Sequence, residues 1–195
     1  HPSTIAYHTF VSEVDGHQRE LTLHQRYLCM FRAVRNRRGE HAQRFREWAR
    51  AIDPEYLRDG LMAYAPSQVA WYDVRRRFTL TTGALSAAGY VLGVGDRHLQ
   101  NFLLDRTTGD NVAIDFGHAF GSATASLGIP ELMPFRMTPQ MVRAFGVLGT
   151  DAVAPAIEAT LKAAQRHRAA ITSLLAVFLD EPLSGWEARQ ELKGA

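Results

Sequence analysis

Cysteine and long apolar runs are scarce in this chain. The single cysteine, Cys29, excludes an internal disulfide and fits a reducing compartment. Its apolar neighbours indicate a small buried side chain and not a nucleophile. No uninterrupted apolar run approaches the roughly 20 residues that a membrane-spanning helix needs. These absences favour a globular domain over a disulfide-stapled or membrane-spanning one.

Lysine is also rare, because Lys162 and Lys193 are the only two in the sequence. The formal net charge of +2 is too small to indicate nucleic-acid binding by itself. The sequence has two local basic clusters, which we interpret as solvated faces of helices and loops. They comprise Arg32, Arg35, Arg37 and Arg38 in one cluster and Arg75, Arg76 and Arg77 in the other.

Helical periodicity dominates the rest of the chain, whose hydrophobic fraction of 46% over 195 residues suits one domain. Apolar spacing predicts helices at 42–52 and 69–92, and one long helix or two end-to-end helices at 157–178. Thr138 followed by Pro139 predicts an N-cap and first turn. The fold class expected is therefore mainly α with one small antiparallel β-hairpin. Weaker signals predict a strand at 10–14 and a helix at 21–34.

The predicted hairpin lies in the stretch from Gly89 to Gly121. Two short apolar runs, 102–104 and 112–114, flank a turn at Thr108 and Gly109. Antiparallel pairing of these runs would bring Asn101 and Asp115 side by side at one end. Their hard oxygen atoms suit a magnesium ion that also holds nucleotide phosphates.

A second pair of polar residues precedes the hairpin. Asp96 and His98 lie in a glycine-punctuated loop and supply a proton acceptor and a phosphate partner. Together with Asn101 and Asp115 they give the order D-R-H-x-x-N followed by D-F-G. Phosphoryl transfer needs this equipment, because position, metal and charge stabilisation do most of the catalysis.

The order of these motifs resembles that of the phosphatidylinositol 3-kinase-related protein kinases and their lipid-kinase relatives. Ordinary protein kinases carry H-R-D-x-x-x-x-N before D-F-G, whereas here the histidine and aspartate are exchanged. The resemblance continues through I-D-F-G-H-A-F-G-S-A-T at 114–124 and P-E-L-M-P-F-R at 130–136. It is strong from about Trp71 to Arg136 and weaker as far as Trp186.

The resemblance implies a serine/threonine protein kinase that uses ATP and Mg²⁺. Asp96 would accept or orient the proton of the substrate hydroxyl, and His98 would stabilise the transferring phosphate or assist proton transfer. Asn101 and Asp115 would bind the metal and, through it, the nucleotide. Arg97 would orient the loop or pair with a carboxylate. Leu103 and Ile114 match family positions that form the apolar floor under the adenine.

The resemblance further implies that residues 1–195 form a partial kinase domain, its C-terminal lobe. The catalytic loop would span 93–101, the metal-binding D-F-G 115–117 and the activation segment 117–136. We expect the N-terminal lobe, with its glycine-rich loop and phosphate-contacting lysine, and the C-terminal FATC-type module to be absent from this sequence.

Similarity to the DNA-double-strand-break-repair branch of the family implies Ser/Thr-Gln protein substrates, a nuclear location, and the Ku heterodimer and DNA ends as partners. No membrane partner is expected. Two alternatives stay open. A phosphoinositide lipid kinase shares D-R-H and D-F-G, but residues 117–134 contain no Lys or Arg for a phosphorylated headgroup. A non-catalytic scaffold could keep the fold, although all four polar site residues are present.

The isolated chain should show no phosphoryl transfer, because a glycine-rich phosphate loop and a lysine before the catalytic loop are missing from it. Purified residues 1–195 would be incubated with ATP, Mg²⁺ and a Ser-Gln peptide. The same chain carrying Asp115→Ala controls for contaminating kinases. Turnover above that control would show that this lobe works alone.

Overall fold

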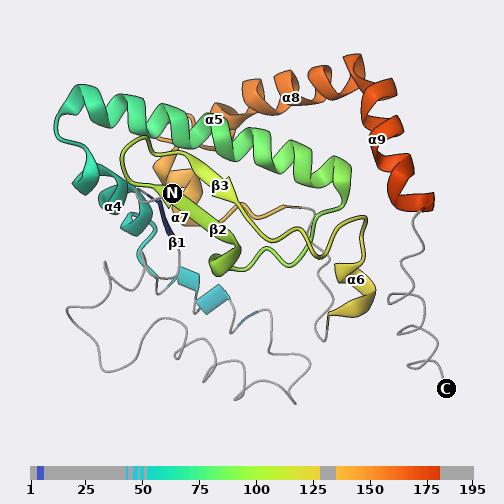
Figure 1. Ribbon diagram of the computed structural model, residues 1–195. Coiled ribbons are helices and arrows are strands. Elements are labelled where there is room, and N and C mark those ends of the chain that lie inside the picture. The colour runs from blue at the N-terminus through green and yellow to red at the C-terminus, as the bar shows by residue number, and fades with distance from the viewer. Residues whose placement is uncertain are drawn as a thin grey trace. The chain divides into compact units, whose positions relative to one another are not determined.

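The computed structural model describes residues 4–6, 43, 46–47, 49–50, 52–127 and 135–180 (Figure 1). The chain divides into two compact units, residues 1–157 and 158–195. The predicted strand at 10–14 and helix at 21–34 lie outside the described residues. Those described within 43–50 are helical, in agreement with the helix predicted at 42–52.

The longest helix of the first unit is α5, Gln68–Leu92, which agrees with the helix predicted at 69–92. Its first turn is capped by Ser67, whose hydroxyl oxygen accepts a hydrogen bond from the Ala70 amide at 3.2 Å. It ends at Gly93, which adopts a left-handed conformation with φ 58°. One face of α5 is buried and contributes Val74 and Phe78 to the core.

A three-stranded antiparallel sheet in the order β1-β2-β3 lies beside α5 (Figure 1). The predicted hairpin is confirmed as β2, Phe102–Asp105, and β3, Asn111–Ala113, with Leu103 opposite Val112. The predicted sheet was incomplete, since it lacked β1, Thr4–Ala6, which pairs with the other edge of β2. Three residues are too few to show a strand period in the sequence.

The hairpin turn is held to α5 by a side-chain pair. Arg77 on α5 donates from Nε to Asp110 Oδ1 at 2.9 Å and from Nη2 to Asp110 Oδ2. The guanidinium holds the pKa of the Asp110 carboxyl below its ordinary value. Asp105 closes the turn by accepting from the amides of Thr107 and Thr108 at 2.8 and 3.0 Å. This partly exposed pair therefore joins the hairpin turn to α5.

Shorter helices complete the core of the first unit. Helix α4, Tyr56–Tyr64, packs on α7, Pro139–Ala144, and both contact the core around Phe78. The predicted cap at Thr138 is confirmed, because its hydroxyl accepts from the Met141 amide at 3.3 Å. The remaining short elements are α6, Ala123–Ser126, and the 3₁₀ helices η1, Leu99–Asn101, and η2, Gly149–Val153.

The C-terminal helical segment consists of two helices, so the two-helix alternative is correct. These are α8, Ala154–Arg166, which begins in the first unit, and α9, Arg168–Asp180. They meet at His167. Its amide donates to the Ala163 carbonyl, and its carbonyl accepts from the Ile171 amide, each at 3.0 Å. Among the described residues, no helix has the length and hydrophobicity to cross a membrane.

Two glycines of α5 should respond in opposite ways to alanine. A Cβ on Gly83 would lie 2.8 Å from the Val153 carbonyl oxygen and 2.9 Å from Ala156 Cβ, whereas one on Gly89 would meet nothing within 4 Å. Gly83→Ala should therefore lower the free energy of unfolding by roughly 1–2 kcal/mol through overpacking. Gly89→Ala should raise it by about 0.5–1 kcal/mol through helix propensity. Urea unfolding checks both, and equal effects would contradict the close packing at Gly83.

Candidate catalytic site

The loop at 93–101 runs from the end of α5 to β2 and lies against the start of the segment at 117–121. The amides of Phe120 and Gly121 donate to the carbonyls of Leu92 and Gly93, each at 2.8 Å. The Gly95 amide donates to the His118 carbonyl at 2.7 Å. A Cβ on Gly93 would lie 2.7 Å from the Gly121 nitrogen, so this approach requires glycine. The expected catalytic loop and activation segment are thus joined by backbone hydrogen bonds.

Asp96 and His98 lie close together on this loop. His98 Nε2 is 3.7 Å from Asp96 Oδ2, and both side chains are partly exposed. His98 Nδ1 accepts from the Gln100 amide at 3.2 Å, so in the neutral ring the proton is on Nε2, toward Asp96. Asp96 has φ 57°, a strained conformation for a residue with a Cβ. Such strain is typical of functional loops.

Asn101 connects this loop to the hairpin. Its Nδ2 donates to the Asp96 carbonyl at 2.8 Å, and its own carbonyl accepts from the Ile114 amide at 3.0 Å. Asn101 is 5% exposed and lies opposite Ile114, the residue before Asp115. The register therefore agrees with the antiparallel pairing from which we predicted that Asn101 and Asp115 are neighbours.

Asp115 is exposed and, like Asp96, has φ 57°. Its Oδ1 accepts from the Gly117 amide at 3.1 Å in an Asx turn. The bond from Asn101 Nδ2 to a carbonyl assigns its Oδ1 as the atom available to a cation. An amide oxygen and a carboxylate are a donor set suited to Mg²⁺, which binds through few protein ligands together with phosphates and water.

The described residues contain no group of three or more His, Cys, Asp or Glu arranged to hold a metal ion. A zinc-type centre would need such a group. A magnesium site of two protein oxygens completed by nucleotide does not need one. The residues present in the site therefore fit the expected metal.

Leu103 and Ile114 lie on one face of the hairpin. Leu103 is half-buried, whereas Ile114 is 38% exposed, as is Val112 opposite Leu103. The alternating residues Phe102 and Leu104 are buried in the core. Val112 was missed as a member of this apolar face, although its two-residue spacing from Ile114 is the signal that could have found it.

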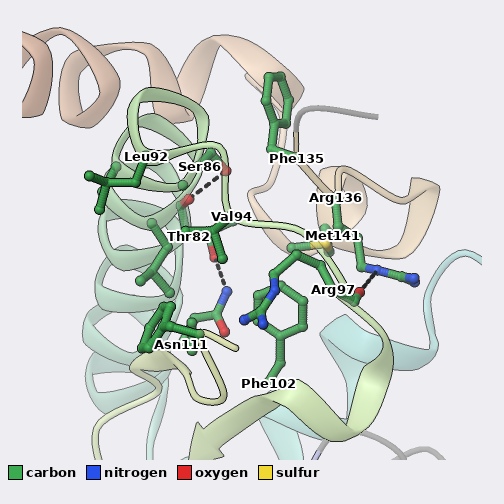
Figure 2. A pocket seen from close by; sticks show the side chains of 15 residues that line it. Thr82, Ser86, Leu92, Val94, Arg97, Phe102, Asn111, Phe135, Arg136 and Met141 are labelled. Carbon is green, nitrogen blue, oxygen red and sulfur yellow. Dashed lines mark hydrogen bonds between the residues drawn. The ribbon is translucent and has the colours of Figure 1, made fainter. Parts of the chain in front are cut away.

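A cavity of about 200 Å³ lies on the other face of the hairpin, between it and α5 (Figure 2). Asn111 contributes to its wall and donates from Nδ2 to Thr82 Oγ1 at 3.1 Å. Phe102 and Arg97 also line it. Because Leu103 and Ile114 do not line it, this cavity is separate from the face expected to receive a nucleotide.

Arg97 is directed into the protein, away from solvent. It is 7% exposed and donates to the carbonyls of Gly95 at 2.8 Å, Ile114 at 2.9 Å and Asp115. Two roles were expected for Arg97, orienting the loop or pairing with a carboxylate. These bonds to backbone carbonyls fit the first role. Sequence reasoning gave no role to Arg136, which donates from Nε to the Arg97 carbonyl at 2.7 Å.

The activation segment expected at 117–136 is described as far as residue 127 and again from 135. Its described part contains α6, whose Ser126 hydroxyl lies 3.1 Å from His118 Nδ1. The Ser126 hydroxyl also donates to the Ser122 carbonyl at 2.7 Å.

The chain belongs to the family described as "Phosphatidylinositol 3- and 4-kinase", whose sequence profile matches residues 7–188. The fold agrees with this membership, since the described residues are mainly helical with a small antiparallel sheet. Its relatives include the phosphatidylinositol 3-kinase-related protein kinases, so the resemblance stated from the motifs is confirmed.

Two curated relatives illustrate the similarity. The DNA-dependent protein kinase catalytic subunit of Canis lupus familiaris is 34% identical over 162 residues, covering 83% of this chain and 4% of that protein. The Target of rapamycin homolog of Caenorhabditis elegans is 36% identical over 140 residues, covering 71% of this chain and 5% of that protein. The chain thus spans about one twentieth of the length of these relatives.

A solved structure agrees at the level of the fold. The structure titled "FAT and kinase domain of CtTel1" has a TM-score of 0.80 and 30% identity, and the match covers 93% of this chain and 13% of that one. The chain is therefore a kinase-domain segment of the protein-kinase branch of its family.

Proposed function

We propose that this chain forms the catalytic lobe of a serine/threonine protein kinase that transfers the γ-phosphate of ATP. The observation that carries the proposal is the bond from the Asn101 amide to the Asp96 carbonyl. It links Asp96, which we propose activates the substrate hydroxyl, to Asn101, a proposed metal ligand. The register of the hairpin places Asp115 near Asn101, at the same end of the two strands. One side chain thus fixes the spacing between the proton acceptor and the metal end of the site.

Each residue then has a defined task. Asp96 orients the substrate hydroxyl and accepts its proton, and His98 faces the same reacting centre and stabilises the transferring phosphoryl group. Asn101 and Asp115 hold Mg²⁺, which neutralises charge on the phosphates when bound. Leu103 and Ile114, together with Val112, offer an apolar face to the adenine.

A protein substrate is favoured over a lipid headgroup by the charge of the activation segment. Residues 117–134 contain no Lys or Arg, and Arg136 is committed to the Arg97 carbonyl. A phosphorylated headgroup requires cationic partners to offset its desolvation. A segment without cationic side chains and punctuated by Gly and Pro suits an extended peptide.

The biological setting is proposed by similarity alone. The relatives include DNA-dependent protein kinase catalytic subunits, and the chain carries D-R-H-L-Q-N and M-P-F-R sequences like those of that branch. We infer Ser/Thr-Gln substrates, a nuclear location and a role in DNA double-strand break repair by non-homologous end joining, with the Ku heterodimer and DNA ends as partners. A non-catalytic scaffold is disfavoured because every proposed site residue is intact.

Loss of the Asp115 carboxylate should abolish activity in the longest natural protein that contains this chain. Asp115→Ala removes a proposed metal ligand, so peptide phosphorylation should fall by at least about 10³-fold. Asp115→Asn keeps an oxygen ligand and should retain nucleotide binding while losing rate. Asp110→Asn, on the hairpin turn, is the matched control and should keep near-normal turnover. Near-normal turnover by Asp115→Ala would refute the metal assignment.

The same protein should phosphorylate peptides and not lipids, because residues 117–134 lack cationic side chains. Parallel assays would offer a Ser-Gln peptide, a matched Ser-Ala peptide and phosphatidylinositol 4,5-bisphosphate vesicles with radiolabelled ATP. We expect Ser-Gln labelling to exceed Ser-Ala labelling about tenfold or more, and vesicles to stay unlabelled. Strong vesicle labelling with a silent peptide would support the lipid-kinase alternative instead.

A further inference from the structure

Arg97 lies between Asp96 and His98 in sequence, but its side chain is buried at 7% exposure. A guanidinium is always charged, and burying it requires acceptors for its N–H groups. The described bonds go to three carbonyl oxygens, those of Gly95, Ile114 and Asp115. One side chain therefore connects the catalytic loop to Asp115, the first residue of the D-F-G sequence, and to Ile114 before it.

Aromatic rings flank the same guanidinium. Its Cζ lies 5.9 Å from the centroid of the Phe102 ring and 5.6 Å from that of the Phe116 ring. These distances are within the range of cation–π attraction. Phe116 is the phenylalanine of D-F-G, so Arg97 contacts that motif through a side chain as well as through carbonyls.

The carbonyls that Arg97 binds belong to a strained part of the backbone. Asp115 has φ 57°, which residues with a Cβ rarely adopt without surrounding support. Arg97 binds the carbonyls before and after the Asp115 α-carbon and so restrains both of its peptide planes. The direction of the Asp115 carboxylate depends on those planes.

The far end of the activation segment reaches the same residue. Arg136 donates from Nε to the Arg97 carbonyl at 2.7 Å, as the dashed line in Figure 2 shows. The Arg97 side chain thus binds Ile114 and Asp115, just before the segment, and the Arg97 carbonyl accepts from Arg136, its last residue. Arg97 therefore connects the D-F-G sequence and the end of the activation segment to the catalytic loop.

We propose that Arg97 is a positioning residue that sets the direction of the Asp115 carboxylate, and that Arg136 stabilises Arg97 in that role. The kinetic test of this inference rests on the proposed function, whereas the hydrogen-exchange test does not. Lysine cannot replace arginine here, because a single ammonium group lacks the planar fork that reaches several carbonyls at once. Misplacing a reacting group by about 1 Å costs roughly 100-fold in rate.

The first test is Arg97→Lys in the longest natural protein that contains this chain. We expect kcat to fall about 10- to 100-fold, the peptide KM to change less than about twofold, and the Mg²⁺ concentration for half-maximal rate to rise several-fold. Arg77→Lys is the matched control, since it changes an arginine that binds the Asp110 carboxylate on the hairpin turn, away from the site. It should leave kcat and the Mg²⁺ dependence unchanged.

The second test needs no activity. Amide hydrogen exchange should become about tenfold faster in residues 114–118 of Arg97→Lys, with no change in α5, because only the local restraint is lost. Unchanged exchange in 114–118, or equally faster exchange throughout the domain, would overturn the proposal. Should the wild type fail to phosphorylate peptides, the proposed function falls while the exchange result still decides the role of Arg97.

Arg136→Lys provides an independent variant if Arg97→Lys does not fold. It keeps the charge but loses the Nε–H bond to the Arg97 carbonyl, so exchange in residues 95–98 should rise several-fold and kcat should fall a few-fold. Wild-type exchange at 95–98 together with wild-type kcat would show that Arg136 has no part in positioning.

Discussion

The buried guanidinium of Arg97 connects the separate parts of this site. The catalytic loop, the end of the hairpin and the end of the activation segment come from different stretches of chain, and all three contact Arg97. Arg97 donates to the carbonyls of Gly95, Ile114 and Asp115, and accepts from Arg136 through its own carbonyl. Because a charged donor makes stronger hydrogen bonds than a neutral one, this arrangement can hold strained backbone at Asp115.

The rigid support for these contacts is the packing of the hairpin on α5. Phe102 and Leu104 bury the inner face of β2 in the core, whereas Arg77 and Asp110 pair only at the turn, at the opposite end of the hairpin from the site. The outer face, with Leu103, Val112 and Ile114, stays accessible. Because side chains of a strand alternate between its faces, one face builds the core and the other is exposed, as the proposed nucleotide contact requires.

Sequence reasoning succeeded where the signal was local. The N-cap at Thr138, the helix α5 and the hairpin turn follow from capping, apolar period and turn chemistry. It was incomplete for β1, because a three-residue strand has no period and forms only against the edge of β2. It also gave no role to Arg136, since nothing in residues 130–136 indicates that this side chain reaches the carbonyl of a residue 39 positions earlier.

The sequence by itself determined the family and the identity of the polar residues, because D-R-H-x-x-N and D-F-G are contiguous patterns whose chemistry is carried by residue type. Only the tertiary structure decided how these residues are oriented. The direction of Arg97 into the core and the left-handed conformations of Asp96 and Asp115 depend on contacts between segments distant in the chain. Such contacts follow from long-range packing, which neither local propensity nor motif spacing encodes.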